Sequence, residues 1–188
     1  MPDTIQLLKS RRSVKPIEMA GPGPSAEELD TILTLGARVP DHGKLVPWRF
    51  IVFEGAAREK AGNLFAEIFK RKNPQATADQ VEVERKRLLH APLVIGVVSR
   101  ARPHVKIPEW EQELSAGASA MNIVTAANGL GYVASWLTGW MAFDRDALNE
   151  FSLAANEKMA GFVHIGRATR PSEDRDRPVL KDIVTRFS

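Results

Sequence analysis

The sequence predicts an α+β fold, in which a mixed β-sheet lies between helices and residues 1–188 form one domain. Segments with apolar residues at helical spacing are interleaved with short apolar runs, and the helical segments dominate. Their irregular order favours α+β over a regular doubly wound sheet. With 188 residues, of which 44% are hydrophobic and 26% charged, the chain is long enough for one compact domain and too short for two.

The first two helices are expected over residues 3–10 and from Ser25 to about Gly36. The second has the stronger start signal, because Glu28 follows Ser25 by three residues, as in a capping box. Pro40 lies just beyond its predicted end, which supports a stop near Gly36.

The rest of the chain alternates strands and helices. The predicted strands cover residues 48–55, 93–99, 132–139 and 161–166. The predicted helices cover residues 56–72, 78–90, 109–129 and, capped by Asp144, a short stretch to about residue 152. The run LVIGVVS at 93–99 is apolar throughout, which is typical of a strand covered on both faces.

Beyond a polar stretch, the C-terminal segment becomes apolar again. This strip could dock on a second subunit as easily as on its own chain, and it contains Val179, Leu180, Ile183, Val184 and Phe187.

Composition excludes several classes of function. The chain has no cysteine, so disulfides, thiol nucleophiles and zinc–thiolate sites are excluded. No apolar run approaches the roughly 20 residues that a membrane-spanning helix needs. In the N-terminal segment the positive charges follow the short apolar stretch, whereas in a signal peptide they precede it. The net charge is only +3 and no reading motif is evident, so nucleic acid is not an expected partner. We expect a cytoplasmic protein with no membrane partner.

Familiar catalytic motifs are also missing. The sequence contains no G-x-G-x-x-G after a strand, no phosphate-binding P-loop, no H-E-x-x-H and no G-x-S-x-G. The four histidines are scattered, so no metal site is expected. Asp41 and His42 are adjacent and should point to opposite sides of an extended segment, so they are not expected to form a catalytic pair.

What remains is a set of cationic and aromatic residues. Arg11, Arg12, Ser13 and Lys15 follow the first predicted helix, and such groups suit a phosphate or an electron-rich carbonyl edge. A solvated charged turn is the alternative explanation, and it applies equally to Arg38 and His42 around Pro40. Trp48 and Trp136 taken singly are as consistent with a core as with a ligand site.

Taken together and in order, four segments resemble the nitroreductase family of flavoproteins, most closely its small single-domain NAD(P)H nitroreductases. The segments are RRSVK (11–15), ARVPDHGKLVPWRFIV (37–52), IPEWEQELSAGASAMNIVTAANGLGY (107–132), and SWLTG (135–139) followed by GFVHIG (161–166). The resemblance implies a nitroreductase-like mixed β-sheet flanked by helices, in an intertwined homodimer that holds FMN at the subunit interface.

The resemblance also implies site residues. No side chain is expected to be catalytic, because the flavin carries the chemistry. The expected FMN contacts are Arg11, Arg12, Ser13, Lys15, Arg38, His42, Pro47, Trp48, Trp136, Leu137, Thr138 and Gly139. Of these, Arg38, His42, Pro47 and Trp48 would reach the flavin of the other subunit. The expected NAD(P)H contacts are Val124, Thr125, Ala126, Ala127, Asn128 and Gly129.

The implied activity is an FMN-dependent oxidoreductase that uses NAD(P)H to reduce nitroaromatics, quinones or similar flat electrophiles by a ping-pong hydride transfer. Alternatives are a flavin-fragmenting or dehalogenating enzyme of the same fold, or a flavin-binding protein without turnover. The chain departs from the family pattern at Lys44, where asparagine is frequent, and at Val46, where glutamine is frequent; both bear on the flavin potential. Arg175 or Arg177 could add a phosphate contact. Neither the physiological substrate nor the choice between NADPH and NADH follows from these residues.

Overall fold

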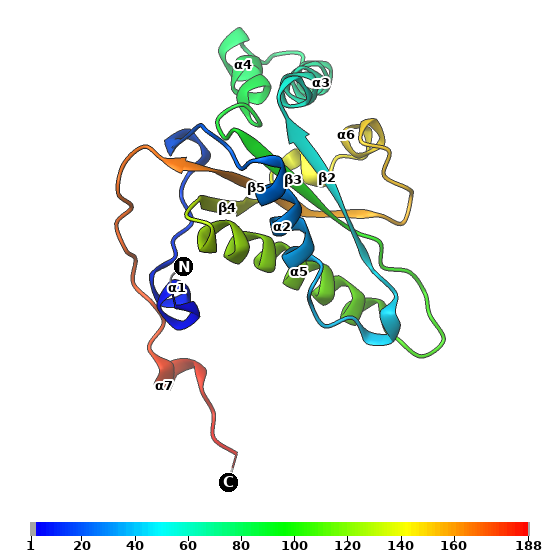
Figure 1. Ribbon diagram of the computed structural model, residues 1–188. Helices are drawn as coiled ribbons and strands as arrows, with labels where there is room; N and C mark the ends of the chain where they lie inside the picture. The colour runs from blue at the N-terminus through cyan, green and yellow to red at the C-terminus, as the bar shows by residue number, and fades with distance from the viewer. Residues whose placement is uncertain (1–2, 188) are drawn as a thin grey trace.

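The computed structural model describes residues 3–187 and confirms the α+β class (Figure 1). One sheet contains the strands β1 (Met19–Ala20), β2 (Trp48–Glu54), β3 (Leu93–Ser99), β4 (Val133–Leu137) and β5 (Lys158–Ala168). Its order is β1-β5-β3-β2, and β4 also pairs with β5. The strand pairs are antiparallel, and the parallel component is an isolated bridge between Ser13 and Ala134.

Helices cover both faces of this sheet. The helices of the structure are α1 (Thr4–Ser10), α2 (Ala26–Gly36), α3 (Ala56–Lys72), α4 (Ala78–Lys86), α5 (Glu109–Gly129), α6 (Arg145–Glu150) and α7 (Leu180–Ile183), of which α7 lies on the C-terminal tail away from the sheet (Figure 1). Figure 1 shows α2 and α5 on one face, with α3, α4 and α6 toward the other. Among residues 3–187, no helix is both long and apolar enough to cross a bilayer.

The central strand β3 confirms the prediction of a strand covered on both faces, since all seven of its residues are buried. Val94 and Val98 belong to the cluster that includes Phe65 of α3, whereas Ile95 and Val97 belong to the cluster built on α5. Because successive side chains point to opposite faces, an uninterrupted apolar run is what two cores require.

Local sequence signals placed most helix ends well. The Ser25–Glu28 capping box is present at the start of α2, and α3 and α5 have the predicted bounds. The helix predicted to reach residue 90 ends at Lys86 instead, because the chain must turn before Pro92 to enter β3. The Arg58 side chain donates to the carbonyl oxygens of that turn at residues 89 and 91.

The strand predictions needed more correction. β5 begins at Lys158, three residues before its predicted start, and β4 is shorter than predicted, with Thr138 and Gly139 beyond its end. The two-residue strand β1 was not predicted, and it is defined only by its pairing with the end of β5.

After β5 the chain runs past α1 and extends away from the sheet (Figure 1). The apolar strip expected there is exposed, from 52% at Val184 to 105% at Phe187. Its side chains are therefore unused by the core of their own chain.

One buried polar group stands out in the core. His164 on β5 is 4% exposed, and its Nδ1 atom has no hydrogen-bond partner among the described residues. Burial, with a smaller contribution from the nearby His90, lowers the pKa of His164 to about 4.

We therefore expect the free energy of unfolding to fall as the pH drops from about 6.5 to 4. The unfolded histidine titrates near 6.5, so in this window the unfolded state binds the proton that the folded state rejects. The loss attributable to His164 should approach about 3 kcal/mol at pH 4. Urea unfolding at fixed protein concentration measures it.

A His164→Gln variant should show a flatter dependence of stability on pH over the same window. The matched control is His104→Asn, which replaces an exposed histidine. In the wild type, His104 Nδ1 accepts hydrogen bonds from the N–H groups of Lys106 and Ile107, and the asparagine oxygen can still accept them. Equal slopes for wild type and His164→Gln would show that this histidine does not cause the acid sensitivity.

Candidate functional site

The free edge of β4 is the starting point of the site. β4 pairs with β5 along one side, and on the other side the described residues 3–187 contribute only the Ser13–Ala134 bridge. The N–H of Val14 donates to the carbonyl of Ala134 at 3.4 Å. Because backbone groups alternate in direction along a strand, the N–H and C=O of Trp136 point to this same side. There no strand pairs with them among residues 3–187.

The predicted cationic segment lies along this edge. Arg11 is the C-cap of α1, and Ser13 and Lys15 are exposed on the segment that follows. Within residues 3–187 neither Arg11 nor Lys15 forms an ion pair. The structure thus brings residues 11–15 to β4 at Ala134, although the two segments are more than a hundred positions apart in sequence.

Arg12 differs from its neighbours because it holds the start of the C-terminal tail. Its Nε donates to the carbonyl of Glu173 at 3.0 Å and lies 3.9 Å from the carboxylate of Asp174. The same carboxylate accepts from Arg177 at 3.0 Å. Asp174 therefore links Arg12 of the segment 11–15 to Arg177 of the tail, whereas Arg175 donates to the same carboxylate through its backbone N–H.

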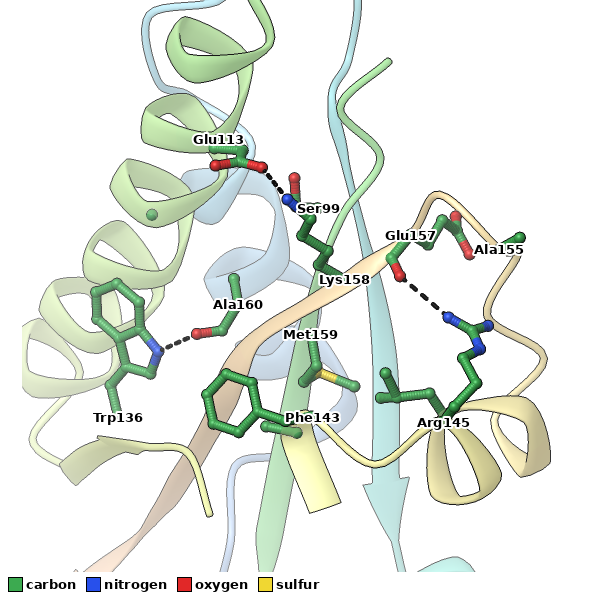
Figure 2. Close-up of a pocket in the computed structure, with 13 residues that line it drawn as sticks. Ser99, Glu113, Trp136, Phe143, Arg145, Ala155, Glu157, Lys158, Met159 and Ala160 are labelled. Atoms are coloured by element: carbon green, nitrogen blue, oxygen red, sulfur yellow. Dashed lines mark hydrogen bonds and ion pairs between the residues drawn. The ribbon is translucent and has the colours of Figure 1, made fainter. Parts of the chain in front are cut away.

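Trp136 is fixed in place at the end of β4. Its Nε1 donates to the carbonyl of Ala160 at 3.1 Å, and the ring lies across Gly161 of the neighbouring strand (Figure 2). A Cβ on Gly161 would clash with Nε1, and Gly161 has a φ of 151°, which favours glycine. A Cβ on Gly117 of α5 would lie 3.6 Å from the far end of the ring.

α5 contains a run of small residues, SAGASA (115–120), and the glycine in it at position 117 leaves room for the Trp136 ring. Trp136 and Leu137 remain 38% and 39% exposed, and Gly139 turns the chain with a φ of 133°. The four residues 136–139 consequently reach the surface at the free edge.

A cavity of about 480 Å³ lies beside Trp136. Phe143, Met159 and Ala160 line it, and Figure 2 shows Lys158 bonded to Glu113 across its rim at 2.6 Å. That hydrogen bond raises the pKa of Lys158. Because the two charges offset each other, the cavity is suited to a flat apolar molecule more than to an ion.

The loop 37–47, which carries the other predicted contacts, is folded tightly. The Asp41 carboxylate accepts from the N–H groups of Leu45 and Val46, each at 3.0 Å. Asp41 and His42 do not bond to each other, as predicted; His42 Nδ1 instead lies 2.8 Å from Glu111 Oε2. Lys44 and Val46 both have positive φ, 55° and 47°. Asparagine tolerates this conformation better than lysine, so the backbone at position 44 is one that an asparagine would adopt more readily.

Other predicted contacts lie behind this loop or elsewhere. Pro47 is buried and Trp48 is only 5% exposed, so both support the loop from inside the chain. No hydrogen bond or ion pair within residues 3–187 joins the loop to residues 11–15 or to β4. Within residues 3–187, Arg38 and His42 therefore make no polar contact with the free edge of their own chain.

The predicted NAD(P)H segment, residues 124–129, is largely buried. Val124 and Ala127 face the core, and Asn128 donates back to the carbonyl of Val124 at 2.7 Å. Only Thr125, Ala126 and Gly129 line a surface groove of about 460 Å³, together with Arg38 and parts of α1 and α2.

Sequence reasoning missed Glu111 and the cavity beside Trp136. Glu111 occupies the first turn of α5, where a carboxylate is ordinarily attributed to the helix dipole, so its sequence carried no further signal. No group of three or more histidine, aspartate or glutamate side chains in residues 3–187 is arranged to hold a metal ion.

Comparisons with known proteins agree on one family. A family model described as "Nitroreductase family" matches residues 8–167. The Escherichia coli K12 protein named "Putative NAD(P)H nitroreductase YdjA" is 34% identical over 166 residues, which cover 87% of each chain.

Two solved structures show the same fold at low identity. A nitroreductase-like family protein from Bacillus cereus gives a TM-score of 0.84 at 19% identity, covering 100% of this chain and 97% of its own. A nitroreductase from Bacteroides fragilis, solved with bound FMN, gives 0.71 at 20% identity and covers both chains completely. With a family match over most of its length and a relative at 34% identity, the chain belongs to the nitroreductase family.

Proposed function

We propose that the protein is an FMN-dependent oxidoreductase that uses NAD(P)H to reduce flat electrophiles such as nitroaromatics and quinones. The observation that carries this proposal is the free edge of β4, whose outward backbone groups at Trp136 have no strand partner in residues 3–187. Beside it lie Arg11 and Lys15, which form no ion pair within the same residues, and Arg12, which is paired with Asp174. A planar ring with hydrogen-bonding edges and an attached phosphate fits both features. The homologue named as an NAD(P)H nitroreductase and the FMN-bound neighbour support it.

Residues at one end of this edge fit the phosphate. The Arg11 guanidinium and the exposed Ser13 hydroxyl are free to donate, and arginine forks match phosphate geometry. The Asp174 carboxylate is paired with both Arg12 and Arg177, so it keeps these two side chains near the place where a phosphate could bind. A bound phosphate would replace that carboxylate as the shared acceptor.

Residues at the other end fit the ring. The outward N–H and C=O of Trp136, and the segment 137–139 beyond it, can bond to the edge of a flat heterocycle. When bound, FMN supplies the redox chemistry, accepting reducing equivalents from NAD(P)H and passing them to the second substrate in turn. The protein binds and orients both partners, and Lys15 offsets the negative charge that accompanies reduction.

A homodimer completes this proposal. Within residues 3–187, Arg38 and His42 make no polar contact with the free edge of their own chain. A second copy of the chain would place its own Arg38 and His42 beside that edge. Large apolar side chains outside the core, among them Leu8, Trp110 and Leu114, are more than half exposed, as is the tail strip. Exposed apolar surface on this scale is typical of an interface.

The function is tested by the visible spectrum of the purified protein. We expect it to be yellow or to take up added FMN, to bleach when NAD(P)H is added without oxygen, and to regain colour with a quinone or nitroaromatic. A protein that stays colourless with excess FMN would refute the proposal. Bleaching with no second turnover would favour a flavin-binding protein over an enzyme.

Replacing Lys15 by alanine should lower the flavin midpoint potential by roughly 30 mV or more, because a nearby positive charge stabilises the reduced form. Spectroelectrochemical titration of the FMN-loaded protein measures the shift, and the rate of anaerobic reduction by NAD(P)H should fall with it. Lys9→Ala, which removes an equally exposed charge on α1, serves as the control. An unchanged potential and reduction rate would exclude Lys15 from this role.

Introducing two charges into the tail strip, Leu180→Asp with Ile183→Asp, should weaken the dimer by roughly a thousandfold or more, since burying each apolar side chain is worth about 2 kcal/mol. Sedimentation velocity should then show the 20.8 kDa monomer at concentrations where wild type is dimeric. Lys181→Asp places a similar charge between the two positions, at a residue that is already polar, and should leave the dimer intact.

A further inference from the structure

Three polar side chains of α5 hold the loop that carries Arg38 and His42. Asn122 Nδ2 donates to the carbonyl of Arg38 at 2.9 Å, and Ser115 Oγ donates to the carbonyl of Pro40 at 2.5 Å. Glu111 Oε2 lies 2.8 Å from His42 Nδ1. Glu111, Ser115 and Asn122 are spaced i, i+4 and i+11, so they share one face of the helix.

The two backbone contacts fix the course of the loop. Asn122 also donates to the carbonyl of Leu35 at 3.1 Å, so one amide joins the end of α2 to the first turn of the loop. Farther along, a Cβ on Gly43 would lie 2.5 Å from Ile107 Cδ1, so the loop lies close against the segment before α5. The loop backbone is therefore held on its α5 side along most of its length.

The contact between Glu111 and His42 has a different consequence. A carboxylate only accepts hydrogen bonds, so the shared proton resides on His42 Nδ1. This leaves Nε2 as the ring atom that faces outward, and it has no hydrogen-bond partner among residues 3–187. The two side chains are 63% and 42% exposed, and ion pairs this exposed contribute little to stability. What the pair supplies is the orientation of the ring.

We propose that Glu111 is a positioning residue that holds the His42 imidazole with Nε2 aimed at the FMN of the other subunit. Ser115 and Asn122 complete this support by holding the backbone on which Arg38 and His42 stand. Glu111 itself does not touch the cofactor; it acts through His42, as the acceptor behind a functional imidazole does in other proteins. The inference rests on the proposed function, which supplies the cofactor.

The first test does not require FMN. Long-range ¹H–¹⁵N spectra resolve the ring nitrogens of the chain's four histidines, and a His42→Asn variant assigns the relevant signals. In wild type, His42 should show a proton held on Nδ1. Glu111→Ala should change the signals toward those of an imidazole whose proton exchanges between Nδ1 and Nε2. Glu111→Gln, whose amide oxygen still accepts a hydrogen bond, should largely preserve the wild-type signals.

The second test measures the dissociation constant of FMN by fluorescence quenching. Glu111→Ala should weaken FMN binding about tenfold, as expected when one oriented hydrogen bond to a ligand is lost, and Glu111→Gln should stay within about threefold of wild type. Glu109→Ala removes another exposed carboxylate from the same turn of α5 and should have no effect. In a His42→Ala background, Glu111→Ala should add less than twofold, because its effect passes through the histidine.

The outcomes are separable. A wild-type protein that binds no FMN would overturn the proposed function, while the histidine spectra would still decide whether Glu111 orients His42. The positioning role is refuted if wild type binds FMN and Glu111→Ala binds it equally tightly. It is also refuted if Glu111→Ala weakens binding as much with His42 absent as with His42 present.

Discussion

The architecture depends on β5 being paired along both edges while β4 is paired along one. β5 joins β3, β4 and β1, so it ties the two cores together, and β4 is left as an edge strand beside a helix end. Unpaired edge groups ordinarily have to be covered, bent away or flanked by charge to prevent unwanted pairing. Here residues 3–187 supply a single bridge at Ala134 and exposed cationic side chains. The edge is therefore flanked by charge, but the rest of its backbone groups have no strand partner.

Charges are divided between the fold and the edge. Away from the edge, carboxylates are committed to partners: Glu157 accepts two hydrogen bonds from Arg49, which lowers the pKa of that glutamate, and Lys72 lies between Asp144 and Asp146. These pairs join α3 or β2 to the segments around α6. Near β4, Arg12 is paired with Asp174, whereas Arg11 and Lys15 form no ion pair in residues 3–187, which is the arrangement expected of groups that bind an anion.

Structural features that depend on residues close together in the sequence could be predicted, and those that depend on residues far apart could not. The Ser25–Glu28 capping box, the bounds of α3 and α5 and the doubly covered β3 depend on neighbouring residues and were predicted. The early start of β5 was not, because Lys158 and Met159 carry no alternating pattern and pair only where β3 happens to end. The positive φ of Lys44 and the contact of Glu111 with His42 depend on a loop meeting a helix some 70 positions away. The resemblance of short segments identified the family and the candidate residues, but their present geometry required the structure.

The contrast between Trp136 and Phe143 bears on how the protein could acquire new substrates. Trp136 is bound to the Ala160 carbonyl and covers a glycine that cannot accept a side chain, so one wall of the cavity is rigid. Phe143 lines the same cavity yet is 74% exposed and belongs to no core cluster. Variation at Phe143 could therefore reshape the cavity at little cost to folding. The cavity thus has one wall, at Trp136, that the packing fixes, and one, at Phe143, that tolerates substitution. Under the proposed function, laboratory selection for bulkier electron acceptors would find its accessible mutations at Phe143.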